Sequence, residues 1–143
     1  MDGLIETLCG RLGPDRVRRP EPTGDPLPER AWKMVPVLGG DWPEGAAPNG
    51  RAAQLRPAVL LDPPERVDVL SAVPDGPPYR LTRGRGPAVD ISAAWGPERI
   101  QTGWWRGPRV ERDYWRAELP GGELVWLFRD RRTGRWFLHG SFR

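Results

Sequence analysis

The spacing of turn-forming residues most constrains how the second half of this chain can fold. Turn signals occur at VPDGPP (73–78), at Pro120-Gly121-Gly122 and at RDRRTG, where Gly134 supplies the positive φ. The intervening segments have the length and alternation of short strands, and they are residues 79–84, 88–96, 113–120, 123–130 and 135–142. An extended arm and a further strand precede them, between Arg56 and the first turn. Five or six short strands predict a mainly β fold, a small antiparallel barrel or curled sheet.

The first part of the chain has a different pattern of apolar residues, prolines and glycines. Residues 4–12 place four apolar side chains on one helical stripe, and Gly13-Pro14 supplies a stop, so one short helix is predicted. Four prolines in residues 18–30 indicate extended or turn structure, and residues 31–38 read as a short strand or an apolar peptide. Residues 39–53 have the composition of a linker. We therefore expect a short helix, an irregular Pro/Gly-rich arm and a linker in residues 1–55, and a small β-rich domain in residues 56–143.

Tryptophan and charge are both distributed unevenly along the chain. Six of the eight tryptophans lie at or after Trp95. Residues 79–143 contain 13 Arg against 7 Asp and Glu, a net charge of +6, whereas residues 1–78 contain 9 basic and 12 acidic residues, a net charge of −3. A basic, aromatic domain behind an acidic leader suits a nucleic acid or an acidic protein as partner.

The tryptophans have two competing interpretations. A small domain needs large apolar side chains to fill its core, so most of them are expected to be buried. Trp104-Trp105 is the exception, because adjacent residues of a strand point to opposite sides and one indole should then face outward. Such a ring with arginines around it is typical of a partner-binding surface. The candidate partner-binding residues are Trp104, Trp105, Arg106, Arg109 and Arg112.

Arginine clusters offer an alternative, a nucleic-acid-binding surface. If two clusters converge on one side of the domain, their guanidinium groups can follow a phosphate backbone while an exposed indole stacks on a base. A solvated face balanced by Glu98, Glu111, Asp113 and Asp130 is the competing interpretation. The candidate nucleic-acid-binding residues are Arg80, Arg83, Arg85, Arg129, Arg131, Arg132 and Arg135.

Reactive groups are scarce. One cysteine, Cys9, and one histidine, His139, cannot assemble a structural zinc site, and a single cysteine cannot form an intrachain disulfide. No nucleophile-elbow sequence, P-loop or G-x-G-x-x-G opening a helix is present. We expect no enzymatic activity, no cofactor and no metal, and a structural role for His139. The sequence also lacks an apolar run of about 18 residues, as a membrane span needs, and the basic-then-apolar pattern of a signal peptide. We therefore expect a cytoplasmic protein without membrane contact.

Several idiosyncratic motifs occur in order along most of the chain. They include PAVLLDPPERVDV (57–69), GPERIQTGWWRG (96–107), RDYWRAE (112–118), WLFRD (126–130) and RWFLHGSF (135–142). With these motifs the chain resembles the C-terminal region of the ImuB family, the catalytically inactive Y-family DNA polymerase-like subunits of the bacterial mutasome. The palm acids of active Y-family polymerases have no counterpart here.

This resemblance implies an adaptor in damage-induced (SOS) mutagenesis and translesion DNA synthesis. The implied partners are a RecA-like mutasome subunit, an error-prone replicative-type polymerase and the sliding clamp, with DNA as the alternative and with the nucleoid as the place of action. The sequence Gln54-Leu55-Arg56-Pro57 is a poor approximation of a clamp-binding peptide.

Overall fold

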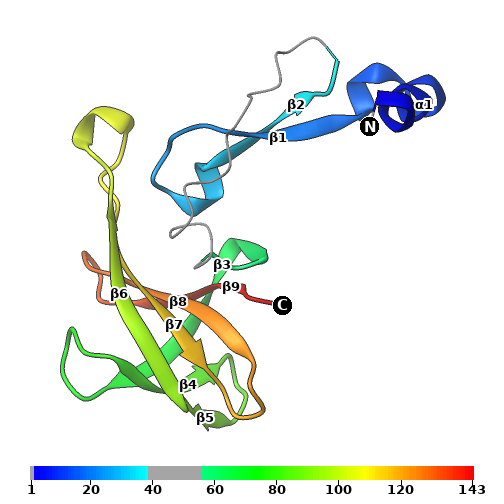
Figure 1. The fold of residues 1–143 in the computed structure, drawn as a ribbon. Coiled ribbons are helices and arrows are strands. Elements are labelled where there is room, and N and C mark those ends of the chain that lie inside the picture. The colour runs from blue at the N-terminus through cyan, green and yellow to red at the C-terminus, as the bar shows by residue number, and fades with distance from the viewer. Residues whose placement is uncertain (1, 39–55) are drawn as a thin grey trace. The chain divides into compact units, whose positions relative to one another are not determined.

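The computed structural model of the chain describes residues 2–38 and 56–143 (Figure 1). The chain forms two compact units, Met1–Gly50 and Arg51–Arg143. The predicted linker at 39–53, with Trp42, and the first two residues of the clamp-like sequence lie outside the described residues.

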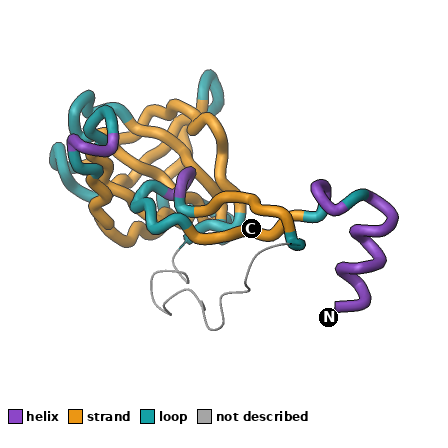
Figure 2. The backbone as a smooth tube through the Cα atoms, turned by 90° about the horizontal axis from the view of Figure 1, so that it is seen from above, coloured by secondary structure: helices purple, strands orange, loops and turns teal. Residues whose placement is uncertain are grey.

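The N-terminal unit contains one helix and a two-stranded ribbon. Helix α1 (Asp2–Leu12) is the helix that the apolar stripe predicts, and it ends where Gly13, with φ 92°, donates its N–H to the carbonyl of Cys9. Two single-turn 3-10 helices follow, η1 (Pro14–Arg16) and η2 (Pro28–Arg30). Strands β1 (Arg18–Pro22) and β2 (Trp32–Pro36) pair antiparallel. The proline-rich arm is therefore extended, as expected, and ordered by pairing with a second strand (Figure 2).

The C-terminal unit is a seven-stranded antiparallel sheet that curls into a half-barrel (Figure 1). Neighbouring strands follow the order β5-β4-β3-β9-β8-β7-β6. The mainly β, curled-sheet fold predicted from the turn spacing is confirmed. The strands are β3 (Val59–Ser71), β4 (Pro78–Arg83), β5 (Ala88–Asp90), β6 (Ala93–Gln101), β7 (Glu111–Glu118), β8 (Leu124–Asp130) and β9 (Trp136–Ser141).

Two details of the strand prediction are wrong. Residues 88–96 do not form one strand, because the N–H of Ile91 bonds to the carbonyl of Tyr79 in β4 whereas the N–H of Ser92 bonds to the carbonyl of Glu118 in β7. At these two residues the chain passes from β5, at one edge of the strand order, to β6, at the other edge. Residues 79–84 were expected to form an edge strand, but β4 lies between β5 and β3.

The hydrophobic core lies on one face of the curled sheet. Alternate residues of β7, β8 and β9 point into it, and Ala117 and Leu127 are completely buried. Strands β3 and β4 contribute one fully enclosed aliphatic side chain each. The buried members are Val67, Leu81, Trp115, Ala117, Leu119, Val125, Leu127, Trp136 and Leu138.

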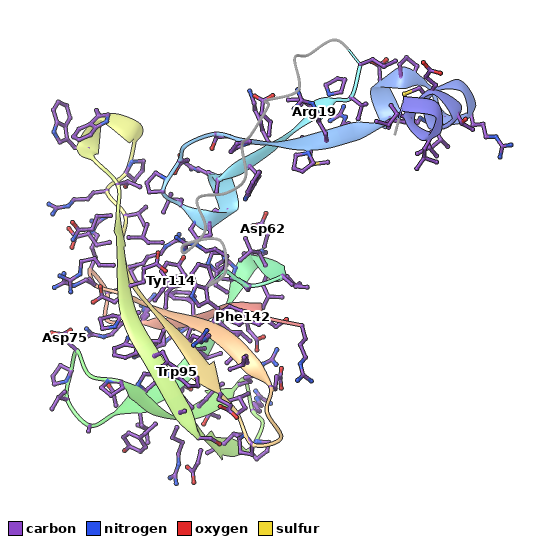
Figure 3. The ribbon with its side chains drawn as sticks, viewed as in Figure 1. Arg19, Asp62, Asp75, Trp95, Tyr114 and Phe142 are labelled. Carbon is purple, nitrogen blue, oxygen red and sulfur yellow. The ribbon has the colours of Figure 1, made fainter. Side chains whose placement is uncertain are left out.

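The opposite face of the same strands carries a second, aromatic layer. Tyr114 (labelled in Figure 3) stacks on Trp126 with ring centroids 4.1 Å apart, and its hydroxyl lies 2.9 Å from Nδ1 of His139. Arg112 donates to the same hydroxyl at 3.0 Å. His139 is 1% exposed and its Nδ1 already has the Tyr114 hydroxyl as partner, which supports the structural role expected for it. Large side chains on both faces, as the alternation of β8 and β9 predicts, leave this small sheet with two packed layers.

Candidate interaction surface

The connection between β6 and β7 forms a closed loop, here called the tryptophan loop (residues 102–110), that extends beyond the sheet (Figure 1). Thr102 fastens its base: the Thr102 N–H donates to the carbonyl of Val110, and the Val110 N–H donates to Oγ1 of Thr102, both at 2.9 Å. Within the loop, residues Trp104–Arg106 form the 3-10 turn η3, which ends at Gly107 with φ 109°. Because a side chain is disfavoured at that angle, the glycine allows the loop to reverse.

Both indoles of the loop are exposed to solvent. Trp104 is 81% and Trp105 is 71% exposed, so the expectation that only one of the two would face outward is wrong. The expectation assumed a strand, in which neighbours alternate, whereas a 3-10 turn places successive residues about a third of a turn apart. The two rings meet edge to face, with centroids 6.0 Å apart and planes at 84°.

The tryptophans of the chain divide differently from the prediction. Of the seven in the described residues, three are buried, namely Trp115, Trp126 and Trp136. The other four are exposed by 43% or more, and they are Trp32, Trp95, Trp104 and Trp105. The expectation that most tryptophans fill the core is therefore wrong, because aliphatic residues of β3, β4, β8 and β9 supply much of the core volume.

The candidate arginines near the loop have distinct environments. Arg109, with its side chain 64% exposed, pairs with Glu111 at 2.5 Å. Arg112 lies over the ring of Phe128, with its Cζ 4.6 Å from the centroid, and belongs to the aromatic layer. The side chain of Arg106 lies outside the described part of the structure.

A groove of about 650 Å³ adjoins the tryptophan loop, and Arg109 borders both. The β8–β9 turn forms its other bank, because the Arg131 N–H donates to the carbonyl of Glu111 and the Arg132 guanidinium donates to the carbonyl of Arg109. Its apolar lining comes from Pro63, Pro64, Pro108, Val110, Phe128 and Phe137. Sequence reasoning missed this groove because its walls come from three separate segments. The available signal was that Phe128 and Phe137 both lie on the non-core face of their strands, where they are register partners.

The alternative arginine set is split between the two ends of the sheet. Arg131 and Arg132 lie beside the tryptophan loop, at the start of β7. Glu118, the last residue of β7, lies at the opposite end of that strand, and its carbonyl accepts the N–H of Ser92. Arg80 pairs with Asp90, only two residues before Ser92 in the sequence. Arg83 and Arg85 follow in the same β4–β5 hairpin. The β4–β5 cluster (Arg80, Arg83 and Arg85) and the β8–β9 cluster (Arg129, Arg131, Arg132 and Arg135) therefore do not form one surface.

Four of these seven arginines form ion pairs, and Arg131 does so with Asp113 at 3.5 Å. Arg80, Arg83 and Arg129 each hold a carboxylate at 2.6 Å, and their partners are Asp90, Glu65 and Asp75. The hydrogen bond from Arg83 lowers the pKa of Glu65, and the bond from Arg80 lowers the pKa of Asp90, so both carboxylates stay charged at neutral pH. For Arg85, Arg132 and Arg135, within the described residues, no ion pair is found. Two of the three arginines of the β4–β5 hairpin are thus paired, but their partners, Asp90 and Glu65, are not the acidic residues expected to balance such a face.

One carboxylate is buried beneath the loop end of the sheet. Asp113, 4% exposed, accepts two hydrogen bonds from Arg99, at 2.8 and 3.2 Å, and lies 3.5 Å from Arg131. The hydrogen bond to Asp113 raises the pKa of Arg99 further above its ordinary value. This cluster ties β6, β7 and the β8–β9 turn together directly below the tryptophan loop and the groove.

Across residues 2–38 and 56–143, no three His, Cys, Asp or Glu side chains are grouped as metal ligands would be. Nor does that part of the chain contain a helix with the length and apolar character that crossing a membrane requires.

Fold and loop together define a small, mainly β domain whose distinguishing feature is a projecting, tryptophan-bearing loop beside an apolar groove. The chain is 37% identical over 153 aligned residues to Protein ImuB of Caulobacter vibrioides, in strain NA1000 / CB15N and in strain ATCC 19089 / CB 15 alike. The resemblance predicted from the motifs is confirmed, and it is consistent with a C-terminal ImuB region.

The alignment covers 97% of this chain and 32% of each ImuB protein, so the chain spans about a third of the length of the curated relatives it matches. No protein-family model matches the chain, and no solved structure matches it.

Proposed function

We propose that this chain is a non-catalytic protein-interaction module of an ImuB-like adaptor in damage-induced translesion DNA synthesis. Similarity to ImuB over 97% of the chain supports a role in DNA damage-induced mutagenesis. The observation that carries the interaction role is the tryptophan loop, where two adjacent indoles are exposed by 81% and 71%. In this proposal the module acts in the cytoplasm, at the nucleoid.

Exposure of this kind favours binding to another protein. Tryptophan and arginine are the residues most enriched among those that dominate interface energies, and a large exposed ring gains most when a partner pocket removes it from water. The loop is also preorganised: Thr102 closes its base, and the ring of Trp105 lies against Gly103. A preorganised loop loses little conformational entropy on binding, which increases the affinity.

The proposed partners follow from the resemblance to ImuB. They are the RecA-like mutasome subunit, the error-prone replicative-type polymerase, or both. The sliding clamp is a third candidate, with weaker support, because the only clamp-like sequence is a poor one and its first two residues lie outside the described structure.

Nucleic-acid binding is the alternative function. The exposed indoles support it, since a base can stack on either ring, and Arg132 and Arg135 lie in the neighbouring β8–β9 turn. The ion pairs of Arg80, Arg83 and Arg129 argue against a broad phosphate-binding surface, because a paired guanidinium has to release its carboxylate first.

A double Trp104→Ala/Trp105→Ala variant tests the proposal. We expect it to remain folded and to lose capture of the RecA-like subunit or the polymerase by at least tenfold in pull-down and calorimetry. Trp32→Ala is the matched control, because Trp32 is exposed by 52% but lies in the N-terminal unit.

Salt dependence then separates the two functions. A protein interface anchored by aromatic rings should weaken mildly between 50 and 200 mM salt, whereas binding through several phosphates should fall by roughly a thousandfold or more. Retention of every protein partner by the double variant, or steep salt-dependent binding of single-stranded DNA that needs the two indoles, would contradict the interaction role.

A further inference from the structure

We propose that the groove beside the tryptophan loop binds an extended, acidic segment of a partner protein and seats one apolar side chain of that segment against Phe137. The inference rests on the proposed function in one respect, that the partner is a protein. It concerns a surface separate from the two exposed indoles, with a recognition chemistry of its own.

The groove has the size and lining of a side-chain pocket. Its volume of about 650 Å³ lies within the roughly 300–1,000 Å³ typical of ligand pockets. Phe128 and Phe137 form the floor, stacked with centroids 5.0 Å apart and planes at 18°. Pro63 and Pro64 face them from β3. These rings are rigid and carry no side-chain donor or acceptor, so the floor favours an apolar side chain.

The rim of the groove is predominantly positive. Three guanidinium groups border it, from Arg109, Arg112 and Arg132, against two carboxylates. Glu111 already pairs with Arg109 at 2.5 Å. Asp130 accepts the backbone N–H groups of Arg132 and Thr133 and thereby holds the β8–β9 turn.

Arg132 is the rim residue most available to a partner. It is exposed, and its guanidinium donates to the carbonyl of Arg109 at 3.3 Å, which leaves further N–H donors of the fork unused by that bond. An acidic side chain placed beside the floor would pair with these donors, and a guanidinium holds a carboxylate in a directional, bidentate way.

A peptide fits this arrangement better than a nucleic acid does. Two carboxylates in the lining oppose a run of phosphates but tolerate one or two separate acidic side chains. Phe128 is 4% exposed, so Phe137 supplies most of the floor that a bound side chain can touch. An extended backbone that alternates acidic and apolar side chains meets both the rim and the floor.

The probe is a synthetic ten-residue peptide with one phenylalanine flanked by glutamates, titrated into the full chain and followed by calorimetry and by amide chemical shifts. We expect saturable binding, with shifts concentrated at residues 108–112 and 131–137. Arg132→Glu should weaken it at least tenfold. Arg85→Glu is the matched control, an exposed arginine at the far end of the sheet, and should change it less than twofold.

Two altered peptides and an oligonucleotide complete the test. Replacing the phenylalanine with serine, or the glutamates with glutamines, should each weaken binding at least tenfold. The inference is overturned if Arg132→Glu and Arg85→Glu weaken peptide binding equally, or if the serine peptide binds as tightly as the phenylalanine peptide. It is also overturned if single-stranded oligothymidylate displaces the peptide and the binding of that oligonucleotide requires Arg132.

The same variants distinguish this inference from the proposed function. If Trp104→Ala/Trp105→Ala abolishes capture of the mutasome partner while Arg132→Glu binds it normally, the interaction role stands and the groove inference fails. If the full chain binds the acidic peptide through Arg132 but no mutasome partner needs the tryptophan loop, the groove inference stands and the proposed function fails.

Discussion

Replacing Gly103 with alanine should rearrange the tryptophan loop without unfolding the domain. Gly103 has φ −69° and ψ 150°, an extended conformation open to any residue, so the substitution introduces no backbone strain. Its effect is steric, because the ring of Trp105 lies where the new methyl group would be. The Cζ2 and Cζ3 atoms of that ring would be 2.5 Å from the added Cβ, about 0.9 Å shorter than the 3.4 Å at which ordinary contact begins.

The indole has to move, and the stability change should be small. Trp105 is 71% exposed, so the ring can be displaced into solvent without disturbing the core. Moving it breaks the edge-to-face contact with Trp104, which contributes roughly 0.5–1.5 kcal/mol. The alanine recovers about 0.4–1 kcal/mol by restricting the unfolded chain. The free energy of unfolding should therefore change by less than about 1 kcal/mol, whereas losing a tryptophan anchor at an interface costs about 2 kcal/mol or more, roughly a 30-fold weaker affinity.

Urea unfolding, the indole N–H signals of the nuclear magnetic resonance spectrum and partner affinity measure these three effects. Gly10→Ala is the control, since a Cβ there meets nothing within 4 Å. An unchanged Trp105 indole signal would show that the ring does not lie on Gly103. A loss of more than about 2 kcal/mol in stability would show that the loop supports the fold rather than presenting a surface.

The remaining predictions concern stability. Asp113→Asn should destabilise the domain by about 2–3 kcal/mol in urea unfolding, because it weakens two charge-assisted bonds to Arg99, which is itself half exposed and can be rehydrated; a loss below about 0.5 kcal/mol would contradict this. Leu127→Ala should cost about 2–5 kcal/mol and reduce near-ultraviolet dichroism, because Leu127 is completely buried in the core; full native dichroism with under 1 kcal/mol lost would refute it. The hydrogen bond from Arg83 lowers the pKa of Glu65 in the folded state. The stabilisation of the fold by this ion pair is therefore present above pH 4.5 and is lost as the pH falls below that value. Being an exposed pair, it contributes less than about 1 kcal/mol, and Glu65→Gln should reduce the stability difference between pH 7 and pH 3; an identical difference in both proteins would rule the pair out.

Local patterns predicted the parts of this protein that depend on local physics. The turns at Gly121-Gly122 and Gly134 have positive φ in the structure, as turn chemistry requires, and the strands between them form where expected. The stripe in residues 4–12 forms α1, and the alternation in β8 places Trp126 and Leu127 on opposite faces. The resemblance to ImuB also rests on sequence alone, and similarity over nearly the whole chain supports it.

The interaction surface required the tertiary structure. The sequence GWWRG has the composition of a strand, and only the Thr102–Val110 hydrogen bonds show that it is a loop with both indoles outside. The groove joins segments around Pro63, Arg109 and Phe137, and that proximity depends on which strands pair.

The sequence also could not predict which arginines form ion pairs, because the partners are distant along the chain. Arg129, for example, pairs with Asp75, 54 positions away. Turns and periodicity follow from contacts between near neighbours, so the amino-acid order alone determined them. Exposure, grooves and ion pairs follow from long-range packing, so only the folded sheet decided them.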